Sequence, residues 1–209
     1  MENTFLITKC MLRPSEGSSL QEDYDIIAGN PIIDYYESIE SPSISMTVTF
    51  IDVDQVIGRK GITGGEYIDV IVKVDDEGTD DFKITTDKQK LMLNSVRNMV
   101  TESNKQVATL EFVSVETIVN ETARVNKKYT GNISDTVVEL LVGDSIGIQT
   151  SKTLFGPKKK ELGETNVEED RATNSYSFVG NLKRPFDTIQ WLCPKAQSCL
   201  LYTSDAADE

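Results

Sequence analysis

The side chains that could do chemistry in this chain are mostly carboxylates. The 209 residues include 34 Asp and Glu and no histidine. The lack of histidine excludes Ser-His-Asp and Cys-His nucleophiles and histidine-based zinc sites, although carboxylate chemistry stays open. Glu37 and Glu40 are a candidate pair for glycoside hydrolysis, but they precede an extended segment with no sign of a cleft. A turn that enters a strand is the favoured interpretation, and we predict that the protein is not an enzyme and has no catalytic residues.

Three further stretches suggest ligand sites, and each has a simpler interpretation. The stretch GRKGITGG (58–65) lacks the Gly-Lys-Ser/Thr ending of a phosphate loop, and a strand rather than a helix follows it. In VDDEGTDDF (74–82), Gly78 is misplaced for an EF-hand and the closing glutamate is absent, so a solvated acidic hairpin is the favoured interpretation. The lysines of PKKK (157–160) are interpreted as a solvated loop. We therefore expect no metal and no cofactor.

Charge and cysteine content limit the partners that this chain can have. Its formal net charge is −13, which repels nucleic-acid phosphates and anionic lipid. No stretch approaches eighteen apolar residues, and the first residues lack the basic and apolar regions of a signal peptide. Cys10, Cys193 and Cys199 form no CxxC pair and are interpreted as free buried thiols.

Alternating apolar residues predict a β-rich first part of the chain. The alternation is clearest at Ile44, Met46, Val48 and Phe50, which are separated by polar residues. This pattern is typical of a half-buried strand. Further strands are predicted at 67–74, 82–86, 90–99 and 106–115. Their spacing predicts a meander or barrel of antiparallel strands up to about residue 117.

Helical patterns begin near residue 116. The stretch 114–125 predicts a short helix, and the stretch 132–144 predicts a stronger one with Ser134 as its N-cap and Gly143 at its end. The apolar stripe of the stronger helix consists of Ile133, Val137, Leu140 and Leu141.

The last part of the chain predicts a loop, a strand and a helix. Residues 153–174 are polar and rich in turn formers, and residues 175–181 indicate a short strand. The stretch 184–194 predicts a helix with Pro185 at its first helical position and Trp191 as a core anchor. We expect the core side of this helix to consist of Phe186, Ile189 and Leu192.

Two motifs in a fixed order suggest a family. In the first, an acidic turn leads through a proline into an alternating strand, and a Gly-Gly-Glu loop and a second strand follow. Its residues are Glu37, Ser41, Pro42, Ile51, Asp52, Ile62, Gly64, Gly65 and Glu66. The second motif, at 173–196, contains Asn174, Tyr176, Phe178, Gly180, Asn181, Arg184, Pro185, Phe186 and Asp187. With the segment 123–141 between them, the motifs resemble the baseplate central hub proteins of contractile-tailed, T-even-like bacteriophages over about residues 30–198.

The resemblance implies a structural role. Hub proteins of this family form trimers whose subunits each carry two barrels related to the tail-tube fold. The trimer joins the tail tube to the central spike, and DNA passes through its channel only in transit. The implied fold is mainly β, with an antiparallel tail-tube-like β-barrel over 1–117 followed by part of an inserted α+β domain over 118–198. The implied location is the virion tail baseplate, after assembly in the host cytoplasm, without membrane insertion.

Alternatives from other classes stay open. One is a carbohydrate- or calcium-binding β-module of a tail or surface protein, with the acidic stretch 74–81 as the cation loop. Another is a carboxylate-dependent hydrolase. A hub of a related contractile injection system would share the same architecture, and the sequence does not separate it from a phage hub.

The last eleven residues, CLLYTSDAADE (199–209), follow no strand or helix period. They resemble the translation of a transposon adapter used in sequencing-library preparation. We therefore expect residues 199–209 to be an adapter artefact, and the chain to be an N-terminal fragment of a hub.

Overall fold

The computed structural model describes residues 5–53, 55–62, 64–74, 80–102, 105–143, 146–148 and 174–197. The chain divides into two compact units, unit 1 (Met1–Thr117) and unit 2 (Ile118–Glu209). Several sequence predictions fall outside the described residues, namely most of the acidic hairpin 74–82, the loop 153–173 with PKKK, Cys199 and the tail 199–209.

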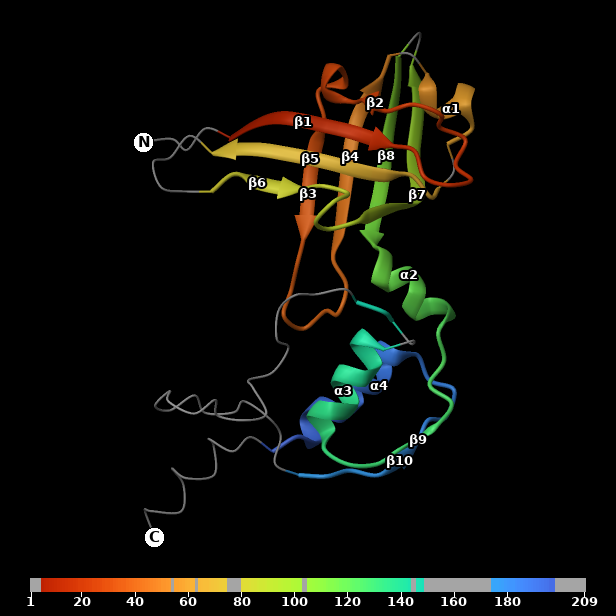
Figure 1. Ribbon diagram of the computed structural model, residues 1–209. Helices are drawn as coiled ribbons and strands as arrows, with labels where there is room; N and C mark the ends of the chain where they lie inside the picture. Colours follow the sequence, from red (N-terminus) through yellow and green to blue (C-terminus); the bar gives the residue numbers. More distant parts are fainter. Residues whose placement is uncertain are drawn as a thin grey trace. The chain divides into compact units, whose positions relative to one another are not determined.

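Unit 1 is mainly β, as predicted, and its strands form an antiparallel sheet (Figure 1). The strands are β1 (Phe5–Arg13), β2 (Tyr24–Asp25), β3 (Ile32–Tyr36), β4 (Ser45–Asp52), β5 (Tyr67–Val74), β6 (Phe82–Ile84), β7 (Leu91–Glu102) and β8 (Lys105–Ser114). The helices are the 3-10 turn η1 (Ile27–Gly29), α1 (Val56–Lys60) and α2 (Val115–Thr122), which carries the chain into unit 2. The strand order is β2-β1-β5-β7-β8-β4-β3, with β6 also paired to β5.

The core of unit 1 lies on the face that the alternation predicted. Met46, Val48 and Phe50 of β4 are buried, whereas the residues between them are only half-buried. Their Cα partners on β8 are the buried Phe112, Leu110 and Ala108. Two neighbouring strands therefore present apolar side chains to one side, because the side-chain period of a strand is two.

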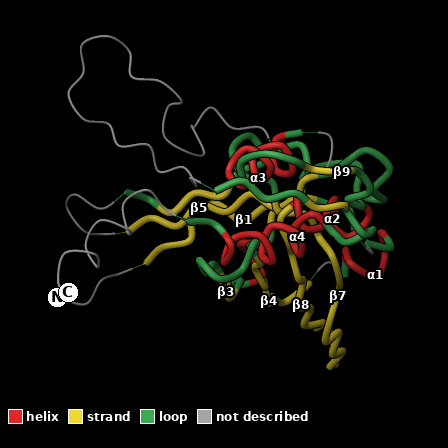
Figure 2. The backbone as a smooth tube through the Cα atoms, turned by 90° about the horizontal axis from the view of Figure 1, so that it is seen from below, coloured by secondary structure: helices red, strands yellow, loops and turns green. Residues whose placement is uncertain are grey.

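The predicted barrel is not closed within the described residues. Strand β5 pairs with β7 only through Tyr67 and Met92, and β1 and β5 cross over β4 and β8 (Figure 1). No described ladder joins β3 to β2. The turn η1 lies close to both β1 and β4, and a Cβ on its Gly29 would lie 2.5 Å from the carbonyl oxygen of Ile51. A turn rather than a strand pair therefore lies between β1 and β4, and β3 is an edge strand beside β4 (Figure 2).

Unit 2 combines helices with a two-stranded sheet. Its elements after α2 are β9 (Lys128–Tyr129), α3 (Ile133–Val142), β10 (Phe178–Val179), α4 (Pro185–Leu192) and the 3-10 turn η2 (Cys193–Lys195). Strands β9 and β10 pair antiparallel. The separate core of this unit consists of Val125, Tyr129, Ile133, Val137, Leu140 and Leu192.

The helix ends confirm most of the sequence signals. Gly143 ends α3 and Pro185 begins α4, as predicted. The N-cap of α3 is Asn132 rather than Ser134, because the Asn132 side chain accepts a hydrogen bond of 2.9 Å from the backbone N–H of Ser134. Asparagine and serine are equally good caps, so only the observed contact separates the two positions.

Two sequence interpretations of single residues need correction, and some strands were not predicted. Trp191, predicted as a core anchor, is 36% exposed because it lies at the edge of an aromatic cluster rather than inside the core. Cys193 is exposed, whereas Cys10 is buried as expected. Strands β1 and β3 were not predicted, because β1 mixes basic residues into its alternation and β3 has only five residues.

Candidate functional site

The glycine loop (residues 64–66) leads into β5 and lies against β7. Gly64 and Gly65 have φ angles of 149° and 95°, which L side chains rarely adopt. Gly65 donates a backbone hydrogen bond of 3.0 Å to the carbonyl of Leu93, and Leu93 donates one of 2.7 Å to the carbonyl of Glu66. The two glycines therefore let the backbone turn beside β7, where β5 and β7 otherwise share a single residue pair.

Glu66 is a buried carboxylate at the end of this loop. It is 0% exposed, and neither carboxylate oxygen has a hydrogen-bond partner of normal geometry. Burial raises the pKa of Glu66, and the nearby backbone N–H groups of Gly64 and Glu66 oppose the shift without cancelling it. The neutral, protonated form of this side chain is therefore more favoured in the folded protein than in the unfolded chain.

The other residues of the first motif have structural positions. Asp52 is buried at the end of β4, and its carboxylate accepts a hydrogen bond of 2.9 Å from the backbone N–H of Ile57 in α1. This contact satisfies a donor in the first turn of α1, whose first residues have no partner within the helix. Pro42 is exposed in the loop between β3 and β4. The motif thus connects β4, α1 and β5 and does not form one cluster of side chains.

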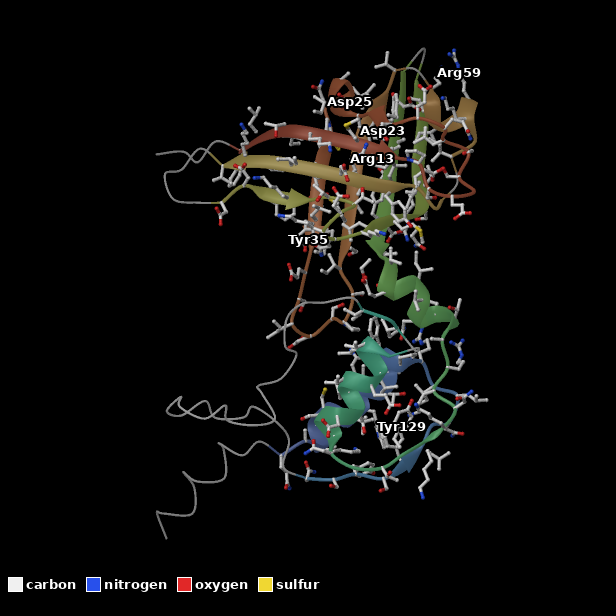
Figure 3. All side chains as sticks on the ribbon, viewed as in Figure 1. Arg13, Asp23, Asp25, Tyr35, Arg59 and Tyr129 are labelled. Carbon is white, nitrogen blue, oxygen red and sulfur yellow. The ribbon has the colours of Figure 1, made fainter. Side chains whose placement is uncertain are left out.

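A cluster of ion pairs surrounds one buried carboxylate in the same sheet, and nothing in the sequence indicated it. Asp69 of β5 is 2% exposed and lies 2.8 Å from Lys9 Nζ and 3.1 Å from Arg13 Nε. It also accepts hydrogen bonds from the backbone and hydroxyl of Thr86. Burial alone would raise the pKa of Asp69, but Lys9 and Thr86 outweigh it and lower the pKa. Arg13 also pairs with Asp23 (Figure 3).

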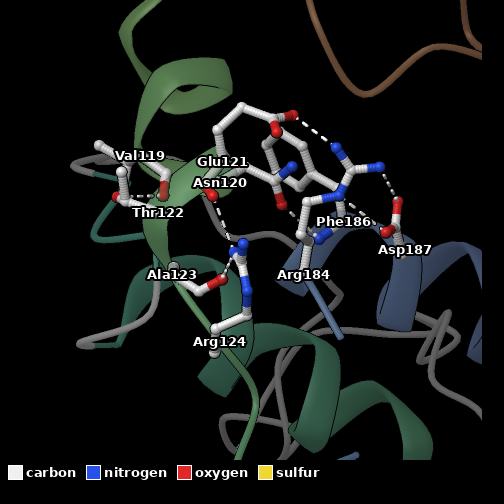
Figure 4. Close-up of polar contacts among 9 residues, drawn as sticks. All are labelled: Val119, Asn120, Glu121, Thr122, Ala123, Arg124, Arg184, Phe186 and Asp187. Atoms are coloured by element: carbon white, nitrogen blue, oxygen red, sulfur yellow. Dashed lines mark hydrogen bonds and ion pairs between the residues drawn. The ribbon is translucent and has the colours of Figure 1, made fainter. Parts of the chain in front are cut away.

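Three residues of the second motif, Arg184, Phe186 and Asp187, form the α2–α4 clamp together with Asn120 and Glu121 of α2 (Figure 4). Asn120 is buried, and its side-chain oxygen accepts a hydrogen bond of 2.8 Å from the backbone N–H of Phe186. Arg184 lies 2.6 Å from Glu121 and 2.9 Å from Asp187. Together these contacts join α2 to the first turn of α4.

Arg184, Pro185, Phe186 and Asp187 are consecutive residues at the start of α4, and nothing in the sequence indicated that α2 supplies partners for them. Asn120 and Glu121 lie in α2, which the sequence predicted only as a short helix over 114–125. Asn120 is 66 residues from Phe186, and nothing local marks it as a cap.

Gly180 and Asn181 of the second motif lie beside an aromatic pocket. A Cβ on Gly180 would lie 2.6 Å from the Val125 carbonyl oxygen, so only glycine fits there. The aromatic pocket has a volume of about 200 Å³ and is lined by Phe178, Val179, Gly180, Asn181, Lys183, Thr188 and Trp191. The rings of Tyr176 and Phe178 contact Trp191 edge-on, at centroid distances of 5.6 and 5.5 Å. Tyr129 stacks on Phe178 from β9 (Figure 3).

The glycine loop, the ion pairs of Asp69 and the α2–α4 clamp hold elements of the fold together, and the aromatic pocket is a feature of the surface. The described part of the chain contains no group of three or more His, Cys, Asp or Glu side chains that could hold a metal ion. Burial, followed by the charge of Asp25, raises the pKa of the Cys10 thiol to about 12, so this thiol is not a nucleophile at neutral pH. No described helix has the length and apolar character needed to cross a membrane.

Comparison with models of known protein families finds no match to this chain, and comparison with curated protein sequences finds none.

Proposed function

We propose that this chain is a structural subunit of a phage tail baseplate hub, which joins the tail tube to the central spike as a trimeric ring. In this proposal unit 1 is a tail-tube-like module, and residues 118–198 belong to an inserted α+β domain. Function then comes from interfaces between subunits and with the two partner proteins, and no residue acts catalytically.

The observation that carries the proposal is the unpaired edge strand β3. Within the described residues, β3 pairs with β4 on one side only. Its Ile32 and Tyr36 are 64% and 57% exposed. An unpaired edge with exposed apolar side chains is a template for association, which proteins usually cover or block. In a closed ring the neighbouring subunits would cover such edges.

The charge of the chain fits the same role. A net charge of −13 disfavours lasting contact with phosphates, so DNA would pass a channel of such subunits without being retained. The motif residues of the glycine loop hold the backbone of unit 1 in place, and those of the α2–α4 clamp do the same in unit 2. This agrees with a role in assembly, because an assembly subunit needs fixed surfaces more than a flexible cleft.

Quantitative mass spectrometry of purified contractile-tailed particles that carry this gene tests the proposal. We expect peptides of this chain at three copies per tail, with the particle's own tube protein as the internal standard. Particles that lack the chain, or that carry it in multiples matching peripheral fibres, would contradict the hub assignment and favour a surface-binding module.

A further inference from the structure

The loop between β3 and β4 presents one apolar side chain to solvent between two acids. Ser41 donates a backbone hydrogen bond of 3.1 Å to the carbonyl of Ser38, which closes a turn with Ile39 and Glu40 at its centre. Ile39 is fully exposed, at 105%. The ESIE turn (residues 37–40) is therefore an exposed apolar projection with a carboxylate on either side.

The aromatic pocket of unit 2 has the opposite character. Its walls are aromatic, and two lysines lie over Trp191, with Lys195 Nζ 4.6 Å and Lys183 Nζ 5.6 Å from the ring centroid. Neither ammonium group forms an ion pair with a carboxylate in the part of the chain that is described. Val179 and Leu182 beside the pocket are each 66% exposed. An apolar centre with a charged rim is typical of a protein interface.

The size of the pocket limits what it can take. Its volume of about 200 Å³ is below the roughly 300–1,000 Å³ of typical small-molecule sites. One branched aliphatic side chain fits this volume better than an oligosaccharide does. The two lysines favour an occupant whose apolar side chain has carboxylates beside it, because the ammonium groups would then be paired.

We propose that the ESIE turn of one copy of this chain inserts Ile39 into the aromatic pocket of a second copy, with Glu37 and Glu40 facing Lys183 and Lys195. Copies with a net charge of −13 repel each other, so a contact between an acidic and a basic surface is the one that charge favours. The contact joins two different patches, and heterologous contacts of this kind form a ring when the rotation between copies closes. The inference rests on the proposed hub function and adds one specific interface to it.

The single tryptophan makes the pocket directly observable. Sedimentation velocity of the full chain over a concentration series is expected to show self-association, with a parallel shift of Trp191 emission. Ile39→Ser should weaken self-association roughly tenfold, as expected for loss of a central apolar anchor. Val53→Ser is the matched control, because Val53 is 62% exposed on the same unit but outside the turn.

Charge reversal separates recognition from misfolding. We expect Glu37→Lys with Glu40→Lys, and separately Lys183→Glu with Lys195→Glu, each to weaken self-association. All four substitutions in one chain should restore it, since each copy then carries both reversed surfaces. The peptide Ac-YESIESP-NH2, from residues 36–42, should shift Trp191 emission of the wild-type chain, whereas the same peptide with Ile39→Ser should not.

Three results would overturn the proposal. Self-association that none of these variants changes would leave the hub function standing and remove this interface. An effect of Ile39→Ser on Trp191 emission that is independent of concentration would place the contact within one copy. A shift of Trp191 emission by glucuronate but not by the peptide would make the pocket a site for an anionic sugar.

Discussion

At the scale of single residues, the two buried acids of unit 1 have opposite environments. Asp69 is surrounded by donors and cations, and its pKa is lowered. Glu66 is equally buried, but its carboxylate oxygens have no hydrogen-bond partner of normal geometry, and its pKa is raised. Because a pKa shift measures a difference between folded and unfolded states, the two residues have opposite effects on the pH dependence of stability.

Glu66 is expected to reduce stability as the pH rises. Its folded pKa lies above its ordinary value of 4.5, so between these two pKa values the folded state holds more protons than the unfolded state. The free energy of unfolding therefore falls as pH rises through this window. Glu66→Gln should raise the free energy of unfolding at pH 7 by about 1–3 kcal/mol, because no charge is then buried. Urea denaturation followed by circular dichroism from pH 4 to 8 measures this.

The gain from Glu66→Gln should shrink toward pH 4, where the wild-type side chain is already neutral. Glu40→Gln is the control, since Glu40 is exposed and its substitution should leave the pH profile unchanged. A gain from Glu66→Gln of the same size at pH 4 and pH 7 would contradict this account.

At the scale of elements, α4 is held at its first turn by a side chain from α2. The N-cap of α4, Arg184, provides no side-chain cap, and Asn120 supplies the missing acceptor to Phe186. An α-helix leaves its first N–H groups without intrahelical partners, so a buried acceptor from another element stabilises its start.

Loss of this acceptor should destabilise unit 2. Asn120→Ala leaves the N–H of Phe186 buried and unpaired, which costs about 1–3 kcal/mol. Glu121→Gln is the matched control on the next residue, where an exposed ion pair contributes at most about 1 kcal/mol. Hydrogen exchange at the first turn of α4 is the measurement. Equal protection losses in the two variants would rule out the capping role of Asn120.

Strand β4 provides a second test at this scale. Val48 is 0% exposed in the core, so Val48→Asp buries an unpaired charge and should cost several kcal/mol, about the whole stability of a domain. Val53→Asp places the same charge at a 62% exposed position just after the strand and should cost roughly 0.5 kcal/mol or less. Solubility and thermal unfolding of the two variants decide this, and a cooperatively folding Val48→Asp chain would mean that the face of β4 is assigned wrongly.

At the scale of the whole molecule, each unit has its own apolar core. The sheet of unit 1 provides most of the β-structure that circular dichroism detects among the described residues, and the only tryptophan of the sequence lies in unit 2. Among the described residues the two cores have no residue in common, so they need not unfold together, and a single free energy of unfolding would then be undefined.

We therefore expect two separate unfolding transitions in urea. Trp191 fluorescence should report unit 2, and far-ultraviolet circular dichroism should report mainly unit 1. Asn120→Ala should move the fluorescence midpoint and leave the circular dichroism midpoint nearly unchanged. Coincident midpoints in the wild type and in this variant would show that the two units unfold as one.

The sequence by itself determined the features that depend on local period and on single special residues. The alternation in β4 located its buried face, and Pro185 and Gly143 marked where helices begin and end. These features can be predicted from the sequence because the side-chain period of a strand and the residue preferences at a helix end depend on only a few neighbouring residues.

Only the tertiary structure decided the features that join distant residues. The cap from Asn120 to Phe186, the burial of Glu66 and the position of η1 between β1 and β4 depend on which elements pack together, and no local sequence pattern specifies that packing. The exposure of Trp191 is of the same kind, because an aromatic residue on a helix fits either a core or a surface pocket until its neighbours are known. Local propensities allow several ways of packing these elements, and the contacts between elements select one of them. Packing within each unit therefore determines the exposed surfaces on which the proposed assembly depends.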